Sequence, residues 1–258
     1  GINRSIILIY AAVLGLDEES FVLNKEENLC EECHGLGYIK VLDQNRIVDY
    51  DIPLAKNPFR CWNRYKDFYQ QIIQQFCTDN SIDANKNFRQ LTNREKPLIL
   101  YGESEKKYSV RYKKSAGFSR RTTRYYGVMT GKPMQVNYAT AGQFYKDEIC
   151  KCCRGKKYSL QHEKWMINGL SIGDFMSMPF EKLLPHIEQM IAENTDTNLQ
   201  FAIKSIHKFV CKAIELNLGY LFFHRSIPTL SGGELQRLRM VQVLSTQLSN
   251  LLLVLDEP

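Results

Sequence analysis

The chain has 258 residues, of which 44% are hydrophobic and 24% are charged, a composition ordinary for a globular protein of one large or two modest domains. No apolar run reaches the roughly 18 residues that a membrane-spanning helix needs, so we expect no membrane span. The net charge of +6 permits a polyanionic partner without requiring one.

The first apolar stretch runs from Ser5 to Leu16 and is not interpreted as a signal peptide, because it is short and lacks a small-residue cleavage site. We therefore expect a cytoplasmic protein with no membrane contact. The eight cysteines then need an explanation other than disulfides, since thiols stay reduced in the cytoplasm. Closely spaced pairs of cysteines usually indicate a metal site.

Two Cys-x-x-Cys pairs, Cys30 with Cys33 and Cys150 with Cys153, each have a glycine two residues after the second cysteine. The glycine permits a sharp turn that points backbone amides at the sulfurs, and four thiolates can close a tetrahedral zinc site. Zinc ligands usually gather within about twenty residues, so spacing alone leaves unrelated thiols as an alternative. A separately folded insert would permit the long separation, because closure entropy rises slowly with loop length. Of the remaining cysteines, Cys152 is interpreted as a spare thiol beside the second pair. Ordinary core or surface thiols are expected at Cys61, Cys77 and Cys211.

Residues 34–149 are rich in Tyr, Phe, Asn, Lys and Arg and predict an inserted subdomain that is mixed α/β or β-rich. Within this subdomain Lys106–Arg124 is basic, contains no acidic residue and has aromatic residues interleaved. Phosphate contacts from such a segment give DNA affinity without sequence preference, and aromatic rings can stack on bases. The alternatives are a solvated basic face and an aromatic core of a small sheet. The candidate DNA contacts are Lys113, Lys114, Arg120, Arg121 and Arg124, with Lys151, Arg154 and Lys156 beside the second cysteine pair.

The last third of the chain is predicted to be mainly helical. An amphipathic segment over about Ile172–Ala192 is expected to bend or restart near Pro179 and Pro185. Apolar residues recur at helical spacing over Leu199–Ile214 and predict a helix with Gly219 as its C-cap.

A further helix is predicted over Leu230–Ser249, with Ser231 as N-cap and Glu234 completing a capping box. Gly232 and Gly233 leave the backbone amides of the first turn uncovered. These amides, the serine hydroxyl and the positive end of the helix dipole together form an anion site. The alternative is a capped helix start that binds nothing.

The apolar run Leu251–Leu255 predicts a strand that is buried on both faces, as in a parallel sheet. Asp256 and Glu257 follow directly and would lie at the carboxyl end of this strand, where ligands of α/β proteins bind. Asp256 is suited to hold magnesium through water, and Glu257 to orient or activate an attacking water. The alternative is a pair of solvated acids after a strand.

The helix start at Ser231, followed by the strand Leu251–Leu255 with its two acids, resembles the signature and Walker B segments of an ABC ATPase. With the two cysteine pairs and the long insert, the chain resembles the UvrA family, in its first half. The resemblance implies a fold of α+β or α/β class, in which residues 1–33 and 150–258 form part of an ABC ATPase domain and residues 34–149 an insertion domain. It also implies zinc on Cys30, Cys33, Cys150 and Cys153. The nucleotide, magnesium and catalytic residues that it implies are Ser231, Gly232, Gly233, Glu234, Gln236, Asp256 and Glu257.

By this resemblance the parent protein uses ATP and Mg²⁺ and acts in nucleotide excision repair. Its implied partners are duplex DNA, a second ABC half, a second UvrA subunit and a UvrB-type helicase. The nearest approach to a Walker A loop, Gly127–Pro133, is one residue short between its glycines and has proline in place of the magnesium-binding hydroxyl. We therefore expect that this polypeptide alone does not hydrolyse ATP.

Three alternatives stay open on the sequence. The first is a UvrA-like paralogue for tolerance of DNA-binding drugs. The second is the ATPase subunit of a membrane transporter, against which the cysteine pairs and the insert argue. The third is a structural, zinc-stapled domain whose ATP motifs are inert in isolation.

Overall fold

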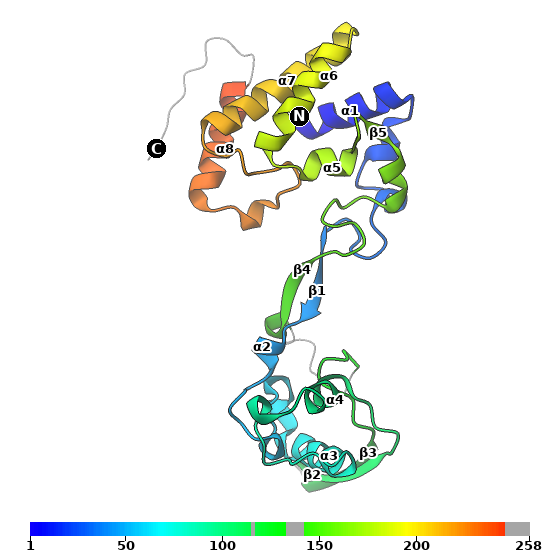
Figure 1. Cartoon of the computed structure of the whole chain (residues 1–258), viewed down its shortest axis with the longest axis vertical. Helices are drawn as coiled ribbons and strands as arrows, with labels where there is room; N and C mark the ends of the chain where they lie inside the picture. Colours follow the sequence, from blue (N-terminus) through cyan, green and yellow to red (C-terminus); the bar gives the residue numbers. More distant parts are fainter. Residues whose placement is uncertain (115–116, 133–141, 246–258) are drawn as a thin grey trace. The chain divides into compact units, whose positions relative to one another are not determined.

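The computed structural model describes residues 1–114, 117–132 and 142–245 (Figure 1). Its elements are of mixed α+β class. The chain divides into two compact units, one of Gly1–Ile39 with Ile149–Pro258 and one of Lys40–Glu148. The predicted strand Leu251–Leu255, with Asp256 and Glu257, lies outside the described residues. Among the described helices, none combines the length and the apolar character needed to span a membrane.

The first unit is built around one helical core. The helix α7 (Thr197–Glu215) contacts α1 (Ile2–Leu14), α6 (Phe180–Glu193) and α8 (Gly232–Ser245). The short helix α5 (Ile172–Ser177) follows a small hairpin of β5 (Met166–Ile167) and β6 (Leu170–Ser171). Figure 1 shows α1, α5, α6, α7 and α8 gathered together. The core residues of α7 recur at helical spacing and are Ile203, Ile206, Phe209, Val210 and Ala213.

The predicted helices of this unit are present, with one error at a terminus, and the part of the last predicted helix from 246 to 249 lies outside the described residues. The amphipathic segment restarts at Pro179, while Pro185 lies inside α6 without ending it. Gly219 is not the C-cap of α7, so that prediction is wrong. The helix ends at Glu215, and Asn217 takes the left-handed conformation with φ 58°. The N–H of buried Leu218 then bonds to the carbonyl of Ala213 at 2.8 Å, and this closure ends the helix before the glycine is reached.

The second unit has its own core around the amphipathic helix α3 (Lys66–Asp79), which packs against β2 (Tyr108–Lys114). The hairpin partner of β2 is β3 (Gly117–Thr123). The other α-helices of this unit are α2 (Gln44–Ile47) and α4 (Glu95–Tyr101). The strands β1 (Tyr38–Leu42) and β4 (Tyr145–Ile149), where the chain passes from one unit to the other, pair in a two-stranded sheet.

Aromatic rings fill much of this second core, which explains the aromatic composition of the segment. Trp62 stacks on Tyr69 with ring centroids 4.7 Å apart, and Phe76 stacks on Tyr125 at 3.9 Å. The Tyr125 hydroxyl donates to the carbonyl of Ile99. Most aromatics near the basic segment are therefore structural, as one of the two sequence interpretations had it.

Candidate metal centre and basic hairpin

The two distant cysteine pairs come together in one buried cluster. The four Sγ atoms of Cys30, Cys33, Cys150 and Cys153 all lie within 4.8 Å of one another. Cys30 Sγ is 3.7 Å from Cys150 Sγ, and Cys33 Sγ is 3.6 Å from Cys153 Sγ. A tetrahedral site with Zn–S bonds of about 2.3 Å places its sulfurs about 3.8 Å apart. The donor set and its spacing therefore fit a closed, structural zinc ion, which these four residues would hold.

The two cysteine turns are built alike. After the second cysteine of each pair, two residues take left-handed conformations: His34 and Gly35 at φ 47° and 80°, and Arg154 and Gly155 at φ 52° and 87°. In each turn the carbonyl of the first cysteine accepts at 2.8 Å from the N–H of the first of these residues. The predicted sharp turn at the glycine is thus present in both pairs.

The turns are also joined to each other by backbone hydrogen bonds. The Cys30 N–H donates to the Lys157 carbonyl at 2.9 Å, and the Cys150 N–H donates to the Gly37 carbonyl at 3.1 Å. Gly37 and Lys157 each stand four residues after the second cysteine of their pair, with φ 82° and 72°. The cluster therefore has an approximate twofold arrangement in its backbone as well as in its sulfurs.

Ionisation of the cluster favours a bound cation. Burial acts to raise the pKa of Cys30, but hydrogen bonds from the N–H groups of Cys33 and Glu32 lower the pKa to about 7. Burial and the Glu32 carboxylate raise the pKa of Cys150. Neighbouring buried thiolates repel each other, so without a countercharge the four thiols do not all ionise near neutral pH. A divalent cation supplies that charge.

Glu32 and Cys152 occupy equivalent positions in the two turns, just before the second cysteine. The Glu32 Oε2 accepts from the Cys152 N–H and from the Cys150 thiol, both at 3.0 Å. Cys152 is half-buried beside the cluster and is not one of the four clustered sulfurs. The pKa values of Cys61 and Cys77 are raised to about 12 by burial, as expected of ordinary structural thiols.

The segment at Ser231 begins a helix with the predicted cap. The Glu234 N–H donates to Ser231 Oγ at 3.3 Å, and the Ser231 N–H donates to Glu234 Oε2 at 2.6 Å. The Tyr220 hydroxyl also donates to Glu234, and with the Ser231 bonds it lowers the pKa of Glu234 to about 2. Ser231, Gly232 and Gly233 are exposed, and no heavy atom lies within 4 Å of a Cβ built on either glycine. The first turn of α8 is therefore open to a ligand.

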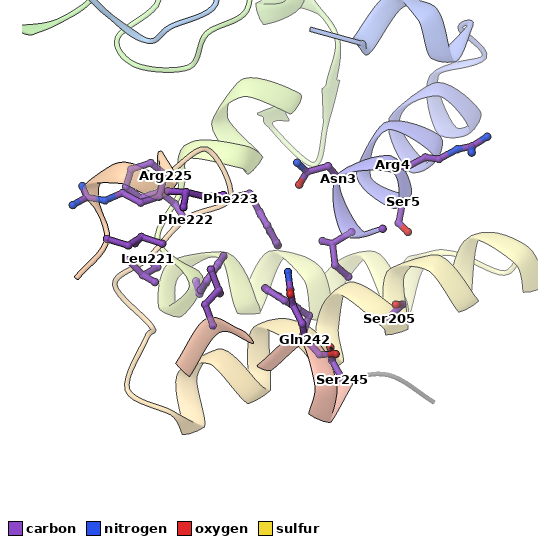
Figure 2. A pocket seen from close by; sticks show the side chains of 17 residues that line it. Asn3, Arg4, Ser5, Ser205, Leu221, Phe222, Phe223, Arg225, Gln242 and Ser245 are labelled. Atoms are coloured by element: carbon purple, nitrogen blue, oxygen red, sulfur yellow. Dashed lines mark hydrogen bonds between the residues drawn. The ribbon is translucent and has the colours of Figure 1, made fainter. Parts of the chain in front are cut away.

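The helix α8 borders a hollow of about 800 Å³. Figure 2 shows the side chains that line it, from the start of α1, from α7, from residues 221–230 and from α8. The lining includes Leu238 and Gln242 of α8, Phe180 of α6 and Phe209 of α7. Along α8, Val241 is fully buried and Leu244 is exposed.

The hairpin of β2 and β3 has one aromatic face and one basic face. The residues that alternate toward α3 include buried Tyr108 and Val110, together with Arg121, whose guanidinium lies 5.9 Å from the Phe68 ring centroid. The opposite face carries exposed Arg111 and Lys113 on β2 and exposed Phe118 and Arg120 on β3. We call these four residues the basic face.

Pairing across the hairpin brings like charges together on the basic face. Arg111 stands directly opposite Arg120, and Lys113 opposite Phe118. The Arg111 guanidinium also lies 4.4 Å from the Phe118 ring centroid, and Phe118 is 66% exposed. Directly opposed like charges destabilise a hairpin, and no acidic partner contacts these cations among the described residues. The arrangement is what an anionic ligand would stabilise.

The other predicted DNA contacts are distributed differently. Arg124 follows β3 and is exposed, and Lys151 and Arg154 are exposed in the second cysteine turn. Lys156 is half-buried and donates to Glu163 and Asp174, both at 2.9 Å, so its charge is already paired. The side chain of Lys114 lies outside the described part of the structure. Arg111 and Phe118 were not singled out from the sequence of Lys106–Arg124, because their common face depends on the strand register.

Comparison with known proteins gives this geometry a context. Residues 43–149 match the family model described as the UvrA DNA-binding domain. The UvrABC system protein A of Staphylococcus aureus strain Mu50 is 26% identical over 254 residues, which cover 94% of this chain and 27% of that protein. The chain is similar to UvrA. This finding confirms the resemblance that the motifs indicated and does not favour the transporter alternative.

A second curated UvrA protein agrees with that similarity. UvrABC system protein A of Helicobacter pylori strain J99 is 28% identical over 250 residues, covering 94% of this chain and 26% of that protein. The crystal structure of UvrA2 from Deinococcus radiodurans covers 96% of this chain and 35% of its own chain, with 20% identity and a TM-score of 0.47. The chain thus spans about a quarter of the length of the curated UvrA proteins it matches.

Proposed function

We propose that the chain is a segment of a UvrA-type protein of nucleotide excision repair that contacts duplex DNA without sequence preference. The observation that carries the proposal is the match of residues 43–149 to the UvrA DNA-binding domain, together with the basic face that these residues present. In this proposal residues 34–149 are the insertion domain, and residues 1–33 and 150–258 belong to an ABC-type ATPase domain.

The basic face suits DNA because its contacts would be to phosphates. Arg111, Lys113 and Arg120 are exposed cations on one side of a two-stranded ribbon. Such contacts supply affinity that does not depend on base sequence, which a sensor of chemically varied lesions requires. Phe118 adds an exposed ring that can stack on a base. Lys114, Arg121, Arg124, Lys151, Arg154 and Lys156 remain proposed contacts, and the ion pairs of Lys156 make it the weakest of them.

Zinc would join the ends of the insertion domain. The four clustered cysteines would hold the ion, whose chemistry here is structural because no coordination position stays open. The remaining ATP chemistry is proposed for the full-length protein. Ser231, Gly232, Gly233, Glu234 and Gln236 would meet a nucleotide held by another ABC half. Asp256 and Glu257 would serve magnesium and the attacking water. The proposed partners are a second ABC half, a second UvrA subunit and a UvrB-type helicase.

A charge-neutralising variant tests the DNA proposal. Arg111, Lys113 and Arg120 are replaced together by Gln, and the matched control replaces Lys56, Arg94 and Lys96 of the same unit by Gln. Affinity for a 30-base-pair duplex is measured by fluorescence anisotropy at several salt concentrations. Each phosphate contact contributes about 0.9 to the slope of log affinity against log salt. We expect the basic-face variant to lose up to about 2.7 of that slope and the control to lose much less. Equal losses in both variants would refute a specific role of the basic face.

A further inference from the structure

His224 is a buried imidazole with no hydrogen-bond partner. It lies in the chain segment that connects α7 to α8 and is only 8% exposed. Neither ring nitrogen has a hydrogen-bond partner among the described residues. The ring stacks on Tyr158 with centroids 5.9 Å apart. An unsatisfied buried polar group costs about 1–3 kcal/mol, so a group of this kind needs an explanation such as a ligand.

The imidazole lines a hollow of about 310 Å³, which shares Asn3, Phe223 and Arg225 with the large hollow beside α8. Four other polar side chains line the same hollow: Asn3 of α1, Lys157 of the second cysteine turn, Arg225, and Tyr158, whose hydroxyl donates to the Phe21 carbonyl. The volume admits a small polyatomic ion with several waters, since one water occupies about 30 Å³ in the liquid. No carboxylate lines the hollow among the described residues.

The charges around this hollow are positive and incompletely paired. Lys157 is half-buried; its charge interacts with the Cys33 and Cys153 thiols, and within the described ranges its ammonium contacts no carboxylate. The Arg225 guanidinium donates to the Thr229 carbonyl at 3.3 Å through one amino group, which leaves its other donors available. Burial and the charge of Lys157 lower the pKa of His224 to about 3. The imidazole is therefore neutral at pH 7 and offers one N–H donor beside two cations.

We propose that this hollow is a binding site for a phosphate group. Lys157 and Arg225 would neutralise its charge, and His224 and Asn3 would donate hydrogen bonds to its oxygens. Two sources share this chemistry, namely a backbone phosphate of DNA and a free phosphate compound. The site and the basic face of the hairpin share no residue, so either proposal can fail while the other holds.

Histidine NMR on the zinc-loaded 258-residue chain tests the site directly, because only five histidines contribute imidazole signals. Inorganic phosphate is titrated to 20 mM at constant ionic strength set with chloride. We expect a saturable shift of the His224 signals and a rise in the pKa of His224, because a bound anion stabilises the imidazolium. The proposal is wrong if the His224 signals do not move, or if all the imidazoles drift together without saturation.

Two variants and one control distinguish specific phosphate binding in the hollow from nonspecific electrostatic attraction. Lys157→Gly removes the ammonium and keeps the turn, since Gly37 occupies the equivalent position at φ 82°. We expect it to weaken phosphate binding at least tenfold. Lys164→Ala removes an exposed positive charge elsewhere in the unit and should leave binding unchanged. Equal weakening by both substitutions would overturn the proposal. His224→Phe should abolish the stabilisation of the fold by phosphate, and the wild-type titration decides the matter if this variant fails to fold.

The same signals identify the source of the phosphate group. If a short duplex shifts the His224 signals and Lys157→Gly removes that shift, the site holds a DNA backbone phosphate. If inorganic phosphate acts and duplex DNA does not, the ligand is a free phosphate compound. The variant with Gln at 111, 113 and 120 should keep its full response to inorganic phosphate, even where its DNA affinity falls.

Discussion

The two cysteine turns share one backbone design but differ in the side chains that they add to it. Both have the same left-handed pair of residues after the second cysteine, and each donates one hydrogen bond to the other. The first turn places Glu32 and Gly37 where the second places Cys152 and Lys157. The shared part fixes the sulfur positions. The differing part gives the first turn an acid beside the cluster and the second a cation beside a hollow, so the halves are equivalent for metal binding and distinct in surface chemistry.

The largest expected effect comes from removing one sulfur. Cys30→Ser should abolish stoichiometric zinc and destabilise the first unit severely, because structural zinc contributes about 10–16 kcal/mol of apparent binding free energy in small domains. Zinc content by mass spectrometry and thermal unfolding measure this. Cys152→Ser is the matched control and should keep one zinc per chain. Loss of zinc in both variants would mean that the fifth cysteine takes part in the coordination.

The next largest effect tests the close approach of the two turns. A Cβ on Gly37 would lie 3.0 Å from the carbonyl oxygen of Gly155, and the residue has φ 82°. Gly37→Ala should therefore destabilise the zinc-loaded chain by about 1–3 kcal/mol, from left-handed strain and the close contact together. Urea unfolding measures the difference. Gly169→Ala, at φ 78° with open space around it, carries the strain without the contact and should cost less.

A smaller effect concerns the acid that only the first turn carries. Once metal is bound, Cys150 is a thiolate, and the Glu32 carboxylate beside it is unfavourable. Glu32→Gln replaces that carboxylate with an amide that can donate to the sulfur, so zinc affinity should rise by about tenfold, the lower end of the effects of outer-shell partners. Competition with a chromophoric chelator measures it, and the exposed neighbour variant Glu31→Gln should change little. A weaker site in Glu32→Gln would show that the carboxylate acts mainly by holding the Cys152 N–H.

The smallest effect has the opposite sign from that of Gly37→Ala. Lys157 has φ 72°, where glycine is unstrained. Lys157→Gly should stabilise the chain by roughly 0.5 kcal/mol, because strain relief of about 1 kcal/mol exceeds the added entropy of the unfolded chain. Urea unfolding in phosphate-free buffer measures this. Destabilisation would mean that the lysine stem contributes packing worth more than the strain.

Local features of the centre followed from sequence, while its surroundings did not. The Cys-x-x-Cys-x-Gly spacing predicts each turn, because a left-handed residue after the second cysteine is a local requirement. The capping box at Ser231 and Glu234 was predictable for the same reason. Gly219 failed as a helix end because burial of Leu218 decides where α7 stops.

Features that depend on register or on contacts distant in sequence could not be predicted. The basic face needs the pairing of Arg111 with Arg120, and a slip of one residue would turn these side chains toward α3. Lys156 resembles its basic neighbours in the sequence, yet Glu163 and Asp174 neutralise it in the structure. The sequence does not indicate a role for His224, because the proposed role follows from its lack of a hydrogen-bond partner among the described residues.

The hydrogen bonds that each cysteine turn donates to the other have a consequence for how such a chain can change. Because Cys150 N–H bonds to the Gly37 carbonyl, the chain leaves and re-enters the first unit at neighbouring points. The segment between those points can therefore be lengthened, shortened or replaced without changing the fold of the first unit. A short glycine-serine linker in place of residues 40–148 should therefore leave the metal-binding unit able to fold. A different domain inserted at the same place should be tolerated in the same way.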